Sequence, residues 1–311
     1  MSIPIINLLD PESSNQIKDA CVNVGFFYLV NHGIPQQMID NAFALSKQFF
    51  DLKDDFKKQY LIQKDNVGYS AMFQEKLDPS TQKLGDHKEA FNFGKFMRSG
   101  TLQRLPPVFE IERQNLEQFS KYCHNTCMRV LKAFGQCLEI PETAGGSHWF
   151  ETRHDYEQPS GDILRFLKYP KSENYDGEEV RAGSHTDYGS ITLLFQKDIG
   201  GLEVLNKTGE WIKAPVISES ILVNVGDLME FWTNSFFQST KHRVVFDPET
   251  MRHNDRYSIA YFCHANDDAK LLPVPSQLPE LQSKLTKHSS EDILTAGQHL
   301  RQRLDATYTY N

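Results

Sequence analysis

Long apolar runs are missing from this chain of 311 residues. No uninterrupted hydrophobic stretch approaches the roughly 20 residues that a membrane-spanning helix needs. The opening stretch from Met1 to Asp10 has no basic segment followed by an apolar one, so we expect no secretory signal. These absences disfavour a membrane as a partner of the protein.

Basic tracts are missing as well. The formal net charge is -8, from 33 basic and 41 acidic residues that are mixed along the sequence. A protein that binds nucleic acid or an anionic lipid surface needs clustered lysine and arginine to neutralise phosphates. The charge pattern therefore predicts no nucleic-acid partner.

Cysteine is scarce, and its number is odd. The five cysteines argue against a disulfide framework and favour a reducing compartment, so we expect a cytoplasmic protein. Cys123 and Cys127 could be taken for a metal-binding pair. They fall on an apolar stripe with helical spacing, which favours packing in the core.

The elements that the sequence does predict change along the chain from helical to strand-like. Helices are expected from Asp10 to Gly25, from about Pro35, over about 110–138 and over about 291–304. After Gly161 short β-rich runs follow one another, separated by turns. These runs are Leu164–Tyr169, Ile191–Phe195, Leu202–Leu205, Ile221–Val225, Leu228–Trp232, Lys241–Phe246 and Arg256–Phe262.

This order predicts a mainly β fold with flanking helices, a jelly roll or barrel core braced by N-terminal and C-terminal helices. We expect an N-terminal helical and β region over 1–150, the β core over 151–270 and a helical tail over 271–311. The three parts are expected to form one compact unit.

A histidine followed two residues later by an acid occurs three times, at His87, His185 and His253. His185 and Asp187 precede a β-run, and residues two apart in an extended chain point to the same side. His242 heads a second β-run, which we expect to face the first pair across a barrel. Two histidines and one carboxylate suit iron(II), because they leave three coordination positions open. A structural zinc site would want four ligands, usually with thiolates.

The other two pairs lack this context. His87-Lys88-Glu89 and His253-Asn254-Asp255 lie in polar segments, so both are expected at the surface. His32 and His264 are expected to be structural residues and not ligands.

The run Arg256-Tyr257-Ser258 is a second candidate site. Period-two alternation places Arg256, Ser258, Ala260 and Phe262 on one face of a strand. A guanidinium with a hydroxyl two residues further on can bind a carboxylate. The alternative is an ordinary salt bridge on a strand.

Together these segments resemble the isopenicillin N synthase-like family of iron and 2-oxoglutarate oxygenases. The resemblance covers nearly the whole chain. It is carried by Gly25 to Ile34, Asp86 to Phe91, Leu164 to Pro170, His185 to Leu194, Asn224-Val225-Gly226-Asp227, His242-Arg243-Val244 and Arg256-Tyr257-Ser258.

The resemblance implies a double-stranded β-helix that holds Fe(II) on His185, Asp187 and His242. It implies 2-oxoglutarate and O₂ as co-substrates, and ascorbate as a candidate reductant. Arg256 and Ser258 would meet the distal carboxylate of 2-oxoglutarate. Tyr169 matches a family tyrosine that contacts the same molecule. Many plant members carry Asn two places before that tyrosine, where this chain has Leu167.

The substrate is expected to be a small molecule, bound by a monomer. Residues considered for its pocket are Phe91, Phe93, Arg165, Leu167 and Phe262. The loop 247–255 is long enough to act as a lid. Two alternatives stay open: an oxidase of this fold that does not use 2-oxoglutarate, so that Arg256 and Ser258 hold a substrate carboxylate, and a non-catalytic ligand-binding barrel.

Overall fold

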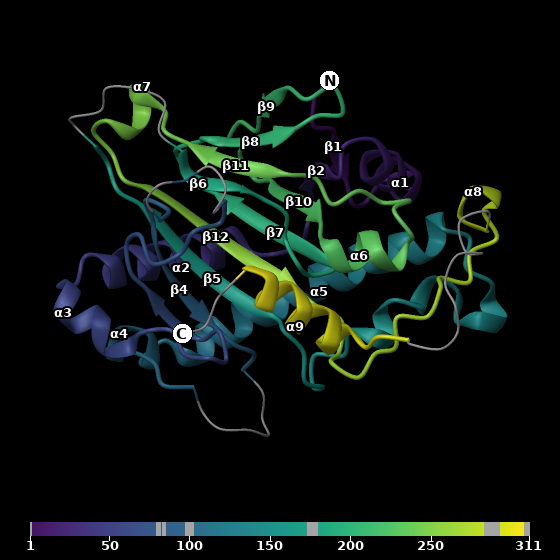
Figure 1. Cartoon of the computed structure of the whole chain (residues 1–311), viewed down its shortest axis with the longest axis horizontal. Coiled ribbons are helices and arrows are strands. Elements are labelled where there is room, and N and C mark those ends of the chain that lie inside the picture. The colour runs from purple at the N-terminus through teal and green to yellow at the C-terminus, as the bar shows by residue number, and fades with distance from the viewer. Residues whose placement is uncertain are drawn as a thin grey trace.

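The computed structural model describes residues 2–78, 82, 85–96, 103–172, 180–282 and 293–307. Within them two β-sheets lie over one another and helices cover the outer side of the larger sheet (Figure 1). This is the predicted double-stranded β-helix with flanking helices.

The larger sheet has eight strands in the order β1-β2-β10-β7-β12-β5-β4-β3. Their bounds are β1 Ile5–Asn7, β2 Phe26–Val30, β3 Gly68–Ser70, β4 Glu89–Phe93, β5 Ile163–Tyr169, β7 Ile191–Gln196, β10 Ile221–Val225 and β12 Arg256–Cys263. Apart from the parallel pair β1–β2, neighbouring strands are antiparallel. The strands from the first third of the chain therefore form both edges of this sheet.

The smaller sheet has four antiparallel strands in the order β6-β11-β8-β9. They are β6 Val180–His185, β8 Leu202–Leu205, β9 Trp211–Lys213 and β11 His242–Val245. The turn Asn206–Gly209 joins β8 to β9, and the Asn206 side chain accepts hydrogen bonds from the backbone N–H groups of Thr208 and Glu210.

The described helices are α1 Ser13–Asn23, α2 Gln36–Phe50, α3 Asp54–Lys57, α4 Pro107–Glu110, α5 Arg113–Cys137, α6 Asp227–Trp232, α7 Pro248–Met251, α8 Pro279–Gln282 and α9 Ala296–Thr307. Short 3-10 turns lie at Lys58–Tyr60, Glu142–Ala144, Gly146–His148 and Glu151–Arg153. Among the described residues no helix is both long enough and apolar enough to cross a bilayer.

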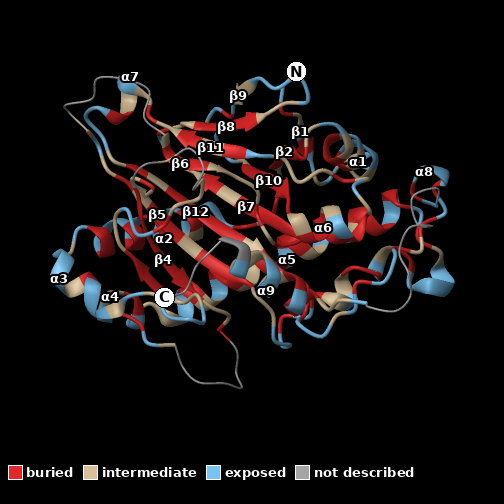
Figure 2. Cartoon of the chain, in the orientation of Figure 1, coloured by how far each residue is buried: buried red, intermediate tan, exposed pale blue. Residues whose placement is uncertain are grey.

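Two hydrophobic cores follow from the two faces of the larger sheet. One face packs against α1, α2 and α5 through a cluster that includes Leu29, Phe49 and Phe134. The other face turns toward the smaller sheet, where Tyr28, Leu167 and Val244 belong to the second cluster. Figure 2 shows the strands as mostly buried and the outer faces of the helices as exposed. A sheet that is covered on both faces carries apolar side chains on both, so polarity alone does not tell the two faces apart.

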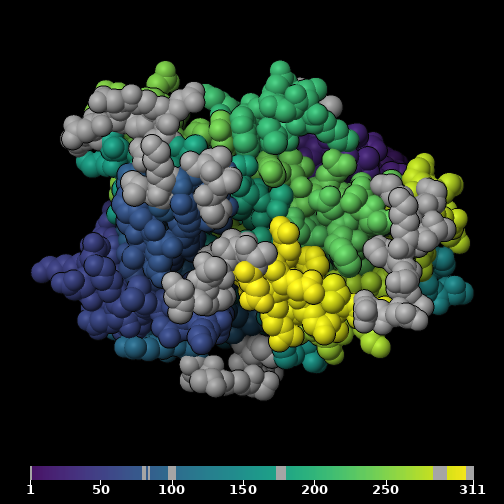
Figure 3. Space-filling view, in the orientation of Figure 1, coloured from purple at the N-terminus to yellow at the C-terminus, as the bar shows by residue number. Residues whose placement is uncertain are grey.

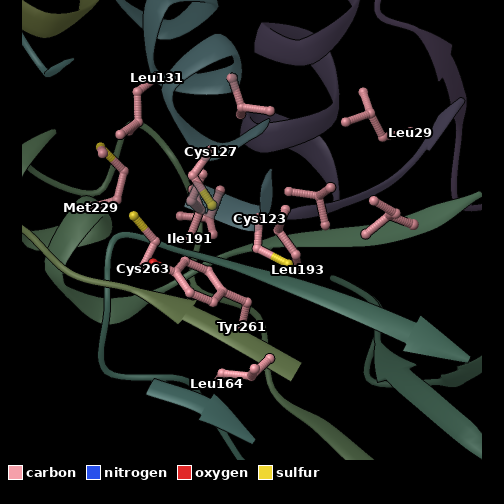
Figure 4. Packing of buried hydrophobic residues seen from close by; sticks show 14 of the residues in the cluster. Leu29, Cys123, Cys127, Leu131, Leu164, Ile191, Leu193, Met229, Tyr261 and Cys263 are labelled. Atoms are coloured by element: carbon pink, nitrogen blue, oxygen red, sulfur yellow. The ribbon is translucent and has the colours of Figure 1, made fainter. Parts of the chain in front are cut away.

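The cysteine pair on α5 lies in the first core, as predicted. Cys123 and Cys127 are fully buried and pack toward Ile191, Leu193 and Cys263 (Figure 4). Burial raises the pKa of both thiols, so they stay protonated and behave as small apolar side chains.

One predicted strand is a helix. Residues 228–232 form most of α6, and Asp227 is the first residue of this helix. Leu228, Met229 and Trp232 are its buried residues, a spacing that one helix face produces. Short apolar runs do not distinguish strand from helix by periodicity, and this caused the error.

The predicted C-terminal helix begins later than expected. Residues 291 and 292 lie outside the described part, and α9 starts at Ala296. Thr295 and Gln298 form a reciprocal capping box, since the backbone N–H of each residue donates to the side chain of the other. This signal was present in the sequence and fixes the start of the helix.

Candidate active site

Three predicted ligand residues meet between the sheets. One ligand atom from each of His185, Asp187 and His242 lies within 4.8 Å of the other two. The Nε2 atoms of His185 and His242 are 3.9 and 3.8 Å from Asp187 Oδ1. Ligand atoms at these separations can bind one ion in common.

Backbone carbonyls set the orientation of both imidazoles. Nδ1 of His185 donates to the carbonyl oxygen of Gly183 at 2.7 Å, and Nδ1 of His242 donates to that of Thr240 at 3.2 Å. A carbonyl oxygen can only accept, so each ring carries its proton on Nδ1 and directs the Nε2 lone pair toward Asp187. The edge of Phe26 also packs on His242, with ring centroids 5.3 Å apart.

Asp187 is held by one of its two carboxylate oxygens. Its Oδ2 accepts hydrogen bonds of 2.7 Å from Thr192 Oγ1 and from Asn224 Nδ2. Oδ1 is left to face the two histidines. Asn224 belongs to the motif Asn224-Val225-Gly226-Asp227, although its role beside Asp187 was not predicted.

The charges of this group suit a divalent cation. Burial alone would raise the pKa of Asp187, but His242 and His185 hold it below the ordinary range. Burial, and next the charge of His242, lowers the pKa of His185 to about 4. At neutral pH the site therefore presents a carboxylate and a neutral imidazole at His185, the form in which such residues bind metals.

The predicted placement of the ligand strands was wrong in one respect. The strands β6 and β11 are neighbours in the smaller sheet, and His185 and His242 lie directly opposite each other in its register. They do not face one another across the barrel. Directly opposed residues of antiparallel strands have Cα atoms only about 4.5–5.5 Å apart, which brings the two rings together; their centroids are 4.3 Å apart.

Arg256 lies deep between the sheets and is 1% exposed. Its Nε donates to the carbonyl oxygen of Gly200 at 2.6 Å, Nη1 to Ser258 Oγ and Nη2 to Gln196 Oε1 at 3.3 Å each. The guanidinium also lies over the Tyr169 ring, 4.8 Å from its centroid. Among the described residues no carboxylate forms an ion pair with Arg256, so the alternative of an ordinary salt bridge on the strand is not observed there. A buried cation without a counter-charge marks a place for an anion.

A cavity of about 310 Å³ connects the metal-ligand group with Arg256. Ser258, Tyr169 and the pocket candidates Arg165, Leu167 and Phe262 line it. The predicted alternation along β12 is confirmed, because Arg256, Ser258, Ala260 and Phe262 all face this cavity.

Phe91 and Phe93 do not line the cavity, and their prediction as pocket residues was wrong. Both are fully buried on the opposite face of β4, where their rings pack on Phe109 at 4.9 and 4.8 Å. Since both faces of the sheet are apolar, alternation alone did not tell which face the phenylalanines take.

The comparison with known proteins agrees with this geometry. A model for the non-haem dioxygenase in morphine synthesis N-terminal family matches residues 3–109, and the 2OG-Fe(II) oxygenase superfamily model matches residues 160–265. The UPF0676 protein of Schizosaccharomyces pombe is 35% identical over 100% of this chain and 94% of its own length.

The chain belongs to the 2OG-Fe(II) oxygenase superfamily.

Two further relatives are similar to this dioxygenase along nearly its whole length. The proline hydroxylase buaE of Petromyces alliaceus is 32% identical over 93% of this chain and 91% of its own. A full-length Neurospora crassa protein solved in complex with alpha-KG is 31% identical, with a TM-score of 0.81 over 98% of this chain and 96% of its own. The Neurospora protein has also been solved with thymine bound beside alpha-KG.

The predicted enzyme class is thereby confirmed as an Fe(II)- and 2-oxoglutarate-dependent dioxygenase. The non-catalytic barrel and the oxidase without 2-oxoglutarate find no support.

Several cavity residues of the dioxygenase were not predicted. His264 follows β12 and lines the cavity, as do Leu300 and Leu304 of α9. Burial lowers the pKa of His264 to about 4, so its ring is neutral and can both donate and accept a hydrogen bond. From the sequence, His264 was predicted to have only a structural role. No local pattern places these residues at the cavity, because they come from segments that meet only in the folded chain.

The prediction that His87-Lys88-Glu89 lies at the surface was wrong. Lys88 and Glu89 are buried in ion pairs: Lys88 with Asp86 and Glu75, and Glu89 with Lys57 at 2.6 Å. At the other pair His253 is exposed, as predicted. Residues 247–255 are not among those lining the cavity in the described part, so the predicted lid gains no support.

A second buried group also combines metal-ligand residue types. His124, Asp162 and Cys263 each place a ligand atom within 4.8 Å of the others. Burial opposes a charge on His124 and on Asp162. The Asp162 carboxylate nevertheless raises the pKa of His124 to about 9, and His124 and Lys95 lower the pKa of Asp162 to about 2. Asp162 also accepts hydrogen bonds from Tyr261 Oη and from the backbone N–H of His264. We interpret the group as a buried ion pair.

Proposed function

We propose that this dioxygenase hydroxylates a C–H bond of a small molecule, with Fe(II) on His185, Asp187 and His242 and 2-oxoglutarate on Arg256, Ser258 and Tyr169. One observation carries the proposal. A convergent set of two histidines and a carboxylate shares a cavity with a buried guanidinium that has no acidic partner among the described residues.

The three ligand side chains fit Fe(II) by their chemistry. Each histidine has its Nδ1 proton bound to a carbonyl oxygen, and the second oxygen of Asp187 is occupied by Thr192 and Asn224. The group thus offers two nitrogen atoms and one oxygen atom on one side, the donor set typical of non-haem iron oxygenases.

The region around Arg256 fits the distal carboxylate of 2-oxoglutarate. Its guanidinium and the Ser258 hydroxyl can donate to both oxygens of a carboxylate. Leu167 pairs with Ser258 in the register of β5 and β12 and lines the cavity. An apolar side chain therefore stands beside the carboxylate site, where many plant members have an amide.

When bound, Fe(II) and 2-oxoglutarate would activate O₂, which is the oxidant: one of its oxygen atoms would enter the substrate as a hydroxyl group, and the other would enter succinate as 2-oxoglutarate loses CO₂. The chain's own part is to hold the co-substrate in one orientation, keep water out of the cavity and direct one C–H bond toward the ligand group. We propose ascorbate as the reductant that would keep the iron in the Fe(II) state.

The cavity volume, about 310 Å³, is at the low end for small-molecule sites and supports a compact substrate. Two relatives suggest the first compounds to screen. Thymine is bound in the Neurospora structure, and proline hydroxylation is named for the Petromyces enzyme. Product formation with either compound would identify the substrate class.

The experiment that tests the site adds Fe(II) and then 2-oxoglutarate to the apoprotein without oxygen. We expect a visible charge-transfer band in the wild type and in Asp198→Ala, which removes an exposed carboxylate. The band should be lost in Asp187→Ala. A band of wild-type intensity in Asp187→Ala would reject the assignment of the ligands.

A further inference from the structure

The C-terminal helix α9 forms one wall of the cavity. Leu300 and Leu304 line it, and residues four apart lie on the same face of a helix. A Cβ atom at Gly161, just before β5, would clash with Leu300 Cδ2, so the Leu300 side chain packs directly against the backbone at this glycine. Figure 3 shows α9 in yellow at the surface, next to the green segment that includes α6.

The first turn of α9 is fixed to the body of the protein. The backbone N–H groups of Ala296 and Gly297 donate to the carbonyl oxygens of Ala269 and Asp267 at 2.9 and 3.1 Å. The ring of His299 packs on Phe231 of α6, with centroids 5.2 Å apart. The second half of the helix, with both leucines, extends along the cavity.

An ion pair of Arg303 holds the second half of the helix and connects it to the metal-ligand loop. Arg303 Nη2 lies 2.5 Å from Asp227 Oδ2, and the same oxygen accepts a hydrogen bond of 3.1 Å from Thr186 Oγ1. Thr186 stands between the ligands His185 and Asp187. The backbone N–H of Asp227 donates to the carbonyl oxygen of Asp187 at 2.7 Å, which closes the connection.

We propose that Arg303 is a positioning residue, which couples the cavity wall formed by α9 to the metal-ligand loop through Asp227 and Thr186. A substrate that packs against Leu300 and Leu304 would press on the helix whose Arg303 holds Asp227. Asp227 in turn fixes the loop from which two of the three ligands come. Filling of the cavity is thereby linked to the placement of His185 and Asp187.

The inference rests on the proposed function only for the role of His185 and Asp187 as ligands. The link itself is tested on the metal-free protein by amide hydrogen exchange. Its reporters are the N–H groups of Asp227 and Leu228, which donate to the carbonyl oxygens of the segment Asp187 to Gly189.

In Arg303→Gln we expect exchange at these two amides to be about two to five times faster, the range for loss of a partly exposed ion pair. The matched control is Arg301→Gln, which removes the same charge from the exposed side of α9. In this control variant, the amides of Asp227 and Leu228 should exchange as slowly as in the wild type. Equal rates in both variants would overturn the proposal.

Two more variants separate coupling from general loosening of the helix. Arg303→Lys keeps the charge and should restore slow exchange, at least in part. In an Asp227→Asn background, Arg303→Gln should have a much smaller effect, because the carboxylate of the ion pair is already lost. A full additional effect would show that Arg303 acts elsewhere.

A separate readout distinguishes this inference from the proposed function. With Fe(II) and 2-oxoglutarate bound without oxygen, Arg303→Gln should shift the visible band, and Arg301→Gln should leave it unchanged. If the wild type binds no iron while the exchange result holds, the link stands and the ligand assignment fails.

Discussion

At the residue scale, the hydrogen bonds around Asp187 separate its two oxygens. Thr192 and Asn224 take Oδ2, and Oδ1 is left for the two histidines. Without these donors the carboxylate could rotate and offer either oxygen. The hydrogen-bond donors around Asp187 therefore decide which of its two oxygens is free to bind a metal ion.

Asn224→Leu tests this point. We expect iron affinity to fall about 10- to 100-fold, the usual cost of losing a hydrogen bond to a metal ligand. Anaerobic titration with Fe(II) measures it. Asn206→Leu, in the turn between β8 and β9, is the control and should bind iron as the wild type does; equal affinities in both variants would contradict the role given to Asn224.

Arg256 provides the second prediction at this scale. Arg256→Ala should weaken 2-oxoglutarate binding by about thirtyfold or more, since truncating one partner of a buried charged contact costs about 2–5 kcal/mol. Iron binding should be retained. Arg252→Ala, at an exposed position, should change neither property. Unchanged 2-oxoglutarate affinity in Arg256→Ala would assign this residue to another ligand.

The third prediction concerns pH and stability. His154 is 1% exposed; its Nδ1 donates to the carbonyl oxygen of Phe150 and its Nε2 accepts from Ser190 Oγ. Burial lowers the pKa of His154 to about 4, whereas the unfolded chain titrates near 6.5. Protonation therefore favours the unfolded state, and stability is complete above pH 6.5 and lost as the pH falls toward 4.

The loss from His154 should reach about 3 kcal/mol, at about 1.4 kcal/mol for each pKa unit. Denaturant unfolding at several pH values measures it. In His154→Gln the decline between pH 6.5 and 4 should be shallower than in the wild type. Parallel pH profiles of the two proteins would contradict the assignment.

At the element scale, β12 and β4 show where alternation in the sequence predicts which way side chains point and where it does not. Alternation correctly placed Arg256 and Ser258 of β12 toward the cavity, because the charged residue lies on this face and the opposite positions carry no charge. In β4 the alternating residues give no such contrast. Phe91 and Phe93 therefore could not be assigned to a face without the partner strands.

The same limit applied to the rest of the site. The ligand pair at His185 could be predicted because its spacing and the following strand are local features of the sequence. The contributions of His264 and α9 depend on contacts between distant segments. The α6 helix was missed because a run of five residues, four of them apolar, carries no period that decides between helix and strand.

Phe91→Ala tests the corrected position of β4. We expect the free energy of unfolding to fall by about 3–5 kcal/mol, as for other buried phenylalanines replaced by alanine. The affinity for 2-oxoglutarate in the folded protein should not change. Phe73→Ala, where the side chain is 47% exposed, is the control and should cost far less. A loss of 2-oxoglutarate binding in Phe91→Ala without loss of stability would return Phe91 to the pocket.

At the scale of the whole molecule, the larger sheet joins the parts of the chain that the sequence separates. Strands from 1–150 lie at both edges, and strands from 151–270 lie between them. We infer that the regions 1–150, 151–270 and 271–311 fold as one unit, since no hydrophobic face of the first region is complete without the second.

Calorimetry of the metal-free protein tests this inference. We expect a single transition whose calorimetric enthalpy equals the van't Hoff enthalpy. Two separated transitions, or a folded fragment 151–270 with native stability, would show independent domains.

The position of β2 beside β10 also sets the order in which the protein can fold. Leu29 of β2 pairs with Ile221, so the pair β1–β2 lacks its neighbour in the sheet until β10 has been synthesised. Folding must therefore wait for late segments, and the high contact order predicts slow refolding. The edge of β4 is exposed until β5 has been made, and the edge of β2 until β10 has been made. Nascent chains therefore need protection from aggregation during synthesis.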